Sequence, residues 1–168
     1  LSQIEILEYT APKGWVLPSI PGSARITIGG SIAADAHGKN HFARNSIGHH
    51  LTSLVIMLAS GEVVEVSRDN MPELFWSTVG GLGLTGIVLR ANLSLQRFGS
   101  CYAKEEMVGF ESIDEMMEII EKTKDQYEYV LGWTSGDFKP GKRWRGAVSI
   151  GNDIAADEIS DPWNLPRR

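Results

Sequence analysis

The stretch TIGGSIAADAHGKN, residues 27–40, decides how the rest of this sequence is interpreted. Its glycines and alanines leave the main chain bare, so a large flat ligand can approach the amide groups closely. His37 and Lys39 follow, and they can place positive charge or hydrogen-bond donors beside an electron-rich ring or a developing anion. A tightly packed turn without a ligand would look similar as far as Ala36, but it would not need the His-Gly-Lys-Asn that comes next. We therefore expect a ligand-binding segment here.

The sequence around this stretch alternates between strand and helix patterns. An apolar run at 51–59 and an alternating run at 62–67, separated by Ser-Gly, predict a β-hairpin. Pro at the start of 72–79 predicts a short helix, and the apolar run at 87–95 predicts another strand. Residues 31–36 suit a short helix or a tight coil.

Two further helices are marked by their first residues. Ser2 with Glu5, and Ser112 with Glu115, form the Ser-x-x-Glu capping box that starts a helix. Apolar residues spaced i, i+3, i+4 and i+7 follow Ser112, so that helix buries one face. With strands expected from 99 to 108, at 127–134 and at 145–150, the fold class is α+β.

The glycines at 81–86, GLGLTG, match the G-x-G-x-x-G pattern of dinucleotide-binding folds. That pattern requires a strand before the glycines and a helix after them, because the pyrophosphate rests on the helix N-terminus. Here the predicted order is reversed, with a helix before and a strand after. We interpret these glycines as a helix C-terminus followed by a closely packed backbone.

All four histidines lie between residues 37 and 50, a polar, glycine-punctuated segment that we expect to be a loop. His37 and His41 are four residues apart and would share one face of a helix, where they could bind zinc. Gly38 and Asn40 disfavour a helix at this point. A hydrolase with a histidine-bound metal is therefore a less favoured alternative, and we predict no metal site.

Charged residues are distributed unevenly along the chain. The 168 residues carry a net charge of −5, yet residues 1–98 hold seven acidic and seven basic side chains. The whole excess lies in 99–168, with fourteen acidic and nine basic residues. This balance does not support a nucleic-acid partner. A single cysteine, Cys101, excludes an internal disulfide, and no apolar run is long enough for a transmembrane segment.

Several spaced motifs occur in one order: TIGG at 27–30, HG at 37–38, LFW at 74–76 and GLTGI at 83–87. Together they resemble the FAD-linked oxidases of the vanillyl-alcohol oxidase and p-cresol methylhydroxylase type. The resemblance implies that 1–98 is the second subdomain of the FAD-binding domain of this family. Residues 99–151 would begin its α+β substrate (cap) domain, and 152–168 would be a tail or linker.

The resemblance also implies site residues. His37 and Lys39 would face a sugar or polyol substrate beside the flavin ring, as catalytic residues of an oxidoreductase that acts on a secondary alcohol. The residues expected to line FAD are Gly22, Thr27, Ile28, Gly29, Gly30, Ala34, Asp35, Ala36, His37 and Ile87.

The sequence begins at Leu1 and lacks the subdomain that binds the FAD pyrophosphate in this family. We therefore expect a piece of a larger protein, inactive alone and with little or no affinity for FAD. The rival from another class is a ligand-free structural or interaction module whose glycines serve only packing. An unpaired edge of the cap sheet would also allow a homodimer.

Overall fold

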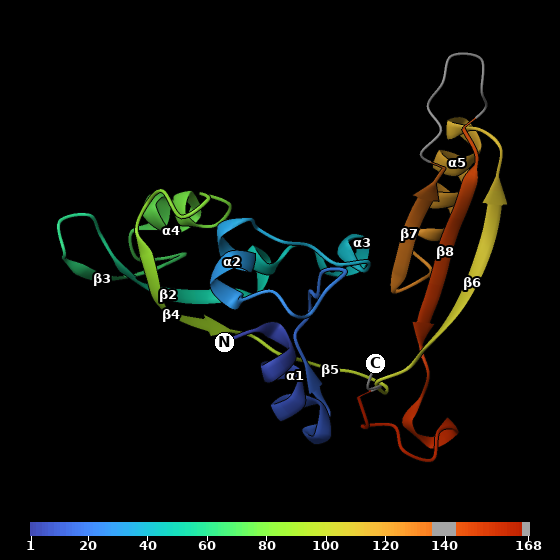
Figure 1. Ribbon diagram of the computed structural model, residues 1–168, viewed down its shortest axis with the longest axis horizontal. Coiled ribbons are helices and arrows are strands. Elements are labelled where there is room, and N and C mark those ends of the chain that lie inside the picture. The colour runs from blue at the N-terminus through green and yellow to red at the C-terminus, as the bar shows by residue number, and fades with distance from the viewer. Residues whose placement is uncertain (136–143, 166–168) are drawn as a thin grey trace. The chain divides into compact units, whose positions relative to one another are not determined.

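The computed structural model describes residues 1–135 and 144–165 (Figure 1). The chain forms two compact units. The first unit comprises Leu1–Gly38 and Asn45–Arg97, and the second comprises Lys39–Arg44 together with the residues from Phe98 onward. Helices and antiparallel sheets occur in both units, which confirms the predicted α+β class. The boundaries at 98 and 151 between an FAD subdomain, a cap domain and a tail stay a prediction.

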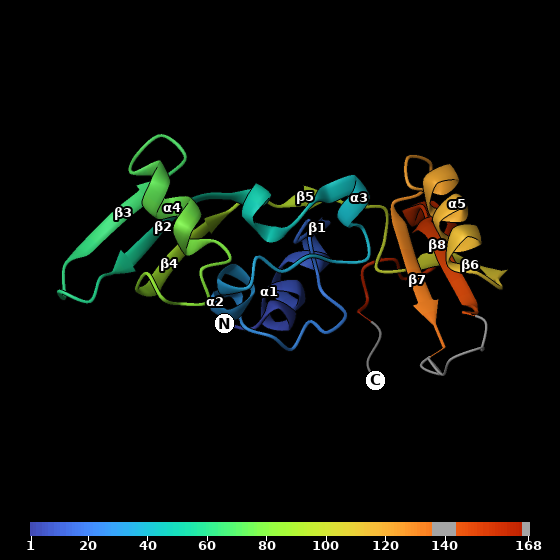
Figure 2. The ribbon, with the colours of Figure 1, turned by 90° about the horizontal axis from the view of Figure 1, so that it is seen from above.

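The first unit is built around the antiparallel sheet β3-β2-β4. Its strands are β2 (Leu51–Met57), β3 (Val63–Ser67) and β4 (Ile87–Leu93), which confirms the hairpin and the strand after it. Figure 2 shows helix α4 (Pro72–Thr78) alongside the sheet. The core of the unit consists of seven buried side chains from the sheet, its preceding loop and two helices: Ile32, Ile47, Leu51, Leu54, Ile56, Val66 and Phe75.

Helices α1 (Gln3–Thr10) and α2 (Ile28–Ala33) complete the first unit. The capping box predicted at the start of α1 is present, with the Ser2 side chain accepting from the Glu5 amide and Glu5 accepting from the Ser2 amide. Two short strands, β1 (Trp15–Val16) and β5 (Gln96–Arg97), pair with each other.

The second unit is the antiparallel sheet β6-β8-β7 with one helix packed on it. Strand β6 (Ala103–Phe110) pairs with β8 (Gly146–Asp153) along eight positions, and β7 (Tyr129–Thr134) pairs with β8 along six. Helix α5 (Ile113–Thr123) covers one face of this sheet (Figures 1 and 2). The helix makes this contact through Met116, Ile119 and Ile120. These side chains pack on the buried strand residues Phe110, Val130, Val148 and Ile150.

Three local expectations need correction. Residues 37–50 contain the one-turn helix α3 (His41–Arg44) and a 3-10 turn at Ile47–His50, so they are not wholly a loop. Helix α2 begins at Ile28, before the predicted 31–36, because Thr27 caps it. Strand β8 continues three residues beyond 150, and a 3-10 turn at Ala156–Glu158 follows. In the described part of the chain, no helix has the length and apolar character that a membrane crossing requires.

Candidate functional site

The TIGG motif starts α2, and its threonine fixes that start. The Thr27 hydroxyl accepts a hydrogen bond from the Gly30 amide at 3.1 Å, and the Thr27 carbonyl accepts one from the Ser31 hydroxyl at 2.9 Å. Threonine is favoured at this position because its side chain satisfies an amide that has no partner within the helix. Thr27, Gly29 and Gly30 are exposed to solvent.

The opposite side of this segment is fastened to α1. The Gln3 amide donates to the Ile26 carbonyl at 2.9 Å, and the Ile28 amide donates to the Leu1 carbonyl at 3.0 Å. Gln3 is fully buried, and its side-chain amide donates to the Ser31 hydroxyl at 2.9 Å. The bare main chain of Gly29 and Gly30 is therefore presented outward by a fixed support.

Asp35 follows α2 in the left-handed conformation, with φ +43°. Its carboxylate accepts from the Ser46 hydroxyl and from the Gly48 amide, both at 3.0 Å. A Cβ on Gly48 would lie 2.6 Å from Val79 Cγ1 and 2.8 Å from Asp35 Oδ1, so only glycine fits. The Asp35 side chain thus holds the turn at 46–48.

The GLGLTG segment rests on the C-terminal end of α2. The Gly80 amide donates to the Ile32 carbonyl at 2.9 Å, and the Leu82 amide donates to the Ala33 carbonyl at 2.8 Å. Helix α4 precedes these glycines and β4 follows them, so the order is the one the sequence predicts and not that of a dinucleotide fingerprint. Leu82, Leu84 and Ile87 are exposed, with Leu84 at 88%.

The first unit therefore carries every residue predicted to line FAD. Gly22, Thr27, Gly29, Gly30, Ala34, His37 and Ile87 are exposed, and Ile28, Asp35 and Ala36 are half-buried. Hydrogen bonds tie the α2 segment to the loop that ends at Ile87. Lys39 is also exposed, but it belongs to the second unit, where its carbonyl accepts from the Val130 amide at 3.0 Å.

These features fit a flavin. A Cβ on Gly22 or Gly29 would meet no atom within 4 Å, so open space lies beside the main chain at both glycines. A planar ring that lies along a main chain needs such space, together with apolar side chains nearby. Ile87 and Leu82 supply exposed apolar surface.

The geometry gives no support to the metal alternative. Within residues 1–135 and 144–165, no three His, Cys, Asp or Glu side chains gather so that they could hold a metal ion. His37 is joined by a β-bridge to Ser46, and the Ser46 hydroxyl lies 3.3 Å from His49 Nδ1.

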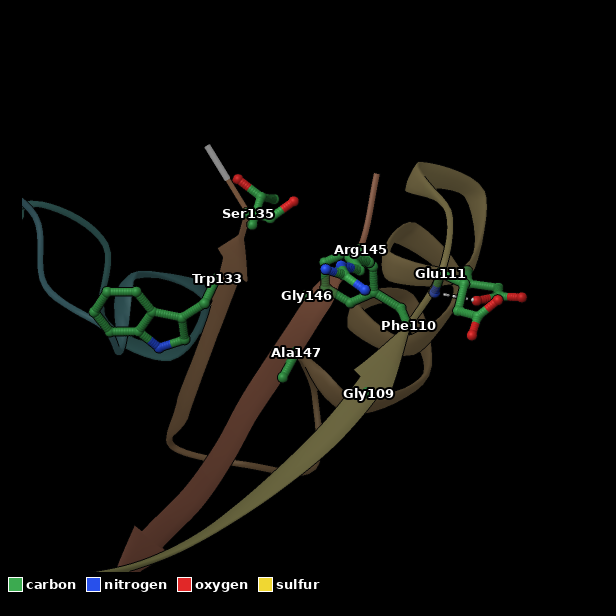
Figure 3. Close-up of a pocket in the computed structure, with 10 residues that line it drawn as sticks. Gly109, Phe110, Glu111, Trp133, Ser135, Arg145, Gly146 and Ala147 are labelled. Carbon is green, nitrogen blue, oxygen red and sulfur yellow. Dashed lines mark hydrogen bonds between the residues drawn. The ribbon is translucent and has the colours of Figure 1, made fainter. Parts of the chain in front are cut away.

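The second unit has an open depression of about 690 Å³ at one end of its sheet (Figure 3). Phe110, Trp133 and Arg145 line it, and the Glu111 amide beside them donates to Glu115 at 2.7 Å. The depression contains none of the predicted catalytic or FAD-lining residues.

A half-buried tyrosine and a half-buried aspartate form a hydrogen-bonded pair elsewhere on this sheet. The Tyr129 hydroxyl donates to Asp153 Oδ1 at 2.8 Å. Burial raises the pKa of both groups, and the neighbouring Asp153 charge raises that of Tyr129 further.

The single cysteine lies in the same unit. Burial, followed by the charges of Asp161 and Asp153, raises the pKa of the Cys101 thiol. A raised pKa disfavours the reactive thiolate form of this side chain.

Comparison with known proteins assigns the class. Residues 2–67 match the family described as "FAD binding domain". This match contains all the predicted site residues except Ile87, and FAD is the cofactor of the domain. The chain is thus a relative of the FAD-linked oxidases and carries part of their FAD-binding domain, as the motifs predict.

Three individual proteins show what this chain is similar to. The chain is 35% identical over 159 residues to decaprenylphosphoryl-β-D-ribose oxidase of Mycolicibacterium smegmatis, a match that covers 92% of this chain and 34% of that protein. It is 28% identical over 132 residues to cytokinin dehydrogenase 8 of Oryza sativa subsp. indica, covering 77% of this chain and 25% of the relative. D-arabinono-1,4-lactone oxidase of Eremothecium gossypii is 22% identical over 142 residues, covering 84% and 26%. The chain spans about a third or less of the length of these relatives.

The structure also shows residues of the site region that the sequence did not reveal. Ser46 and Gly48 fix Asp35 from eleven and thirteen residues away. Arg44 forms an ion pair with Glu128 across 84 residues of sequence. No periodicity or motif connects such distant positions, so these contacts can be identified only from the three-dimensional structure.

Proposed function

We propose that the protein carrying this chain is an FAD-dependent oxidoreductase that oxidises a secondary alcohol of a sugar or polyol. The observation that carries the proposal is the exposed main chain of the TIGG motif, supported from behind by α1 and lying within the segment that matches an FAD-binding domain. Two of the three relatives described above are named for a ribose derivative and an arabinonolactone. Those two names support a sugar-like substrate for this protein.

The proposed reaction transfers two electrons. When bound, FAD supplies the acceptor for the hydride that leaves the carbinol carbon. The hydroxyl proton must leave in the same conversion for the carbinol to become a carbonyl. Proton transfer by a positioned side chain contributes about 10²–10⁴-fold to such a reaction.

His37 and Lys39 are the candidates for this proton transfer and for stabilising the charge that accompanies it. Histidine in its neutral form can accept the hydroxyl proton, and the lysine ammonium can stabilise negative charge that develops on the oxygen. Both side chains are exposed to solvent and stand on either side of Gly38 in the chain. The Lys39 main chain is bonded to β7, which fixes one of the two positions.

The test uses the protein expressed from the complete gene, with decaprenylphosphoryl-β-D-ribose and D-arabinono-1,4-lactone as probes. We expect bound FAD, bleaching of the flavin absorbance by one of the probes, and a loss of about 100-fold or more in turnover for His37→Ala and for Lys39→Met. His49→Ala and Lys122→Met remove the same kinds of side chain elsewhere and should change turnover little.

A protein that binds no FAD would favour the structural-module alternative. Bound FAD with unchanged turnover in both site variants would overturn the roles of His37 and Lys39. A homodimer through the edge strands β6 or β7 is a separate expectation, checked by sedimentation of the same preparation.

A further inference from the structure

Residues Lys39–Arg44 leave the unit to which their neighbours belong. Gly38 and Asn45 are part of the first unit, whereas the six residues between them are part of the second. Asn45 adopts the left-handed conformation, with φ +60°, where the chain returns. Four of the six residues form α3, and a single helical turn is too short to be stable without outside contacts.

Both ends of this segment are bonded to β7 or to the residue before it. At the first end, the Lys39 carbonyl accepts from the Val130 amide at 3.0 Å. At the other end, the Arg44 guanidinium donates from Nε to Glu128 Oε1 at 2.8 Å and from Nη2 to Glu128 Oε2 at 3.0 Å. The Asn40 side-chain amide adds a third donor to Glu128, at 3.4 Å.

Glu128 is itself held in place. Its amide donates to Asn152 Oδ1 on β8 at 2.7 Å, and only 17% of its side chain is exposed. The hydrogen bond with Glu128 raises the pKa of the Arg44 guanidinium. Two parallel hydrogen bonds from a guanidinium to a shielded carboxylate (a fork) fix the orientation of the two side chains as well as pairing their charges.

We propose that Arg44 and Glu128 form a positioning pair that holds the 39–44 segment on β7 and so sets where Lys39 is presented. The segment has two fastening points, and the Val130–Lys39 hydrogen bond is the weaker because it joins neutral groups. Loss of the fork leaves α3 without its charged anchor and lets the Lys39 main chain leave β7. The role of Lys39 in turnover rests on the proposed function, whereas the fastening itself does not.

An ion pair on α5 is far more exposed than the pair of Arg44 and Glu128. Lys122 and Glu118 are 3.3 Å apart on α5, with 74% and 69% of their side chains exposed. Such exposed pairs contribute little. Lys122→Met therefore serves as the matched control for the removal of Arg44.

The first arm of the test measures amide hydrogen exchange of Val130 in the 168-residue chain. Arg44→Met and Glu128→Gln should each speed exchange of this amide by about tenfold, while Lys122→Met leaves it unchanged. Arg44→Lys keeps the charge but loses the fork, and it should restore protection only in part. Exchange of the β6–β8 amides reports whether the sheet stays folded. Unchanged Val130 exchange in Arg44→Met would overturn the proposal.

The second arm uses the FAD-containing protein from the complete gene and decaprenylphosphoryl-β-D-ribose. If Arg44 acts through Lys39, the losses in kcat for Arg44→Met and Lys39→Met are not additive in the double variant. Additive losses would overturn the positioning role. If Lys39→Met leaves kcat unchanged, the proposed function of Lys39 fails, and the exchange arm still decides whether the fork holds the segment.

Discussion

The two units use their backbones differently. Within residues 1–135 and 144–165, all nine residues with left-handed φ belong to the first unit: Gly14, Asp35, Asn45, Gly61, Met71, Gly80, Leu82, Gly83 and Gly86. The second unit has eight continuous pairs between β6 and β8, whereas the β2–β4 pairing has two register shifts. Left-handed residues outside glycine are costly and tend to collect at functional sites.

The amino-acid sequence determines the local structure of the two units in different ways. In the second unit, side-chain pattern determines the fold: helix α5 is amphipathic and packs its apolar residues on a regular sheet. Close main-chain contacts require glycine in both units, for example at Gly48 and at Gly146. Within the described residues, only the first unit also requires left-handed φ angles. This is the property expected of a segment along which a flavin lies.

The largest expected effect concerns the core of the first unit. Phe75 is fully buried between α4 and the sheet, so Phe75→Ala should lower the free energy of unfolding by about 3–5 kcal/mol. The adjacent Trp76 is 44% exposed, and Trp76→Ala should cost much less. Exchange of the β2 and β4 amides measures both. Equal losses for the two variants would contradict the position of this core.

A pair of glycines in the first unit should respond with opposite signs. A Cβ on Gly81 would lie 2.0 Å from the Ser77 carbonyl oxygen, so Gly81→Ala should destabilise the chain by about 1–3 kcal/mol. Gly29 lies within α2 and has open space around it, so Gly29→Ala should stabilise by about 0.5 kcal/mol. Urea denaturation of the two variants provides the measurement, and destabilisation by both would refute the open space at Gly29.

The two capped helices allow the units to be compared directly. Thr27 and Ser112 each accept a hydrogen bond from an amide of the first turn, at 3.1 Å in both helices. Replacement of either by Ala should cost about 1 kcal/mol. Only Thr27→Ala should also weaken FAD binding by the protein from the complete gene, as measured by flavin titration. An equal loss of FAD affinity in Ser112→Ala would remove the distinction between the units.

A further small effect depends on pH. Because burial raises the pKa of Asp153, the folded chain favours the protonated acid. This contribution to stability is complete below about pH 4 and is lost as the pH rises through the pKa of the folded state. Relative to Asp153→Asn, the native chain should therefore lose up to about 1 kcal/mol between acidic and neutral pH, since the group is partly screened. Parallel pH profiles of the two chains would contradict this.

Much of the fold could be predicted because its signals are local. The capping box at Ser2, the Ser-Gly hairpin and the helix at 72–79 depend on residues a few positions apart. At Ser112 only half of the predicted box forms, because Glu115 accepts from the Glu111 amide and not from the Ser112 amide. The one-turn helix α3 was not predicted, because it is stabilised by β7 and Glu128 and not by its own residues. The same limit applies to the site: the motif predicts which segment would lie along FAD, but not that the Asp35 side chain accepts a hydrogen bond from the Gly48 amide.

The central claim is that FAD lies along the main chain exposed at the start of α2. The flavin content of the purified protein from the complete gene, native and with Gly29→Leu, tests it most directly. A Cβ there meets no atom within 4 Å in this chain, so we expect the fold to tolerate a leucine, which would occupy the space proposed for the cofactor. We predict about one FAD per native chain and little or none in the folded variant. A folded Gly29→Leu protein that keeps its full complement of FAD would contradict the account.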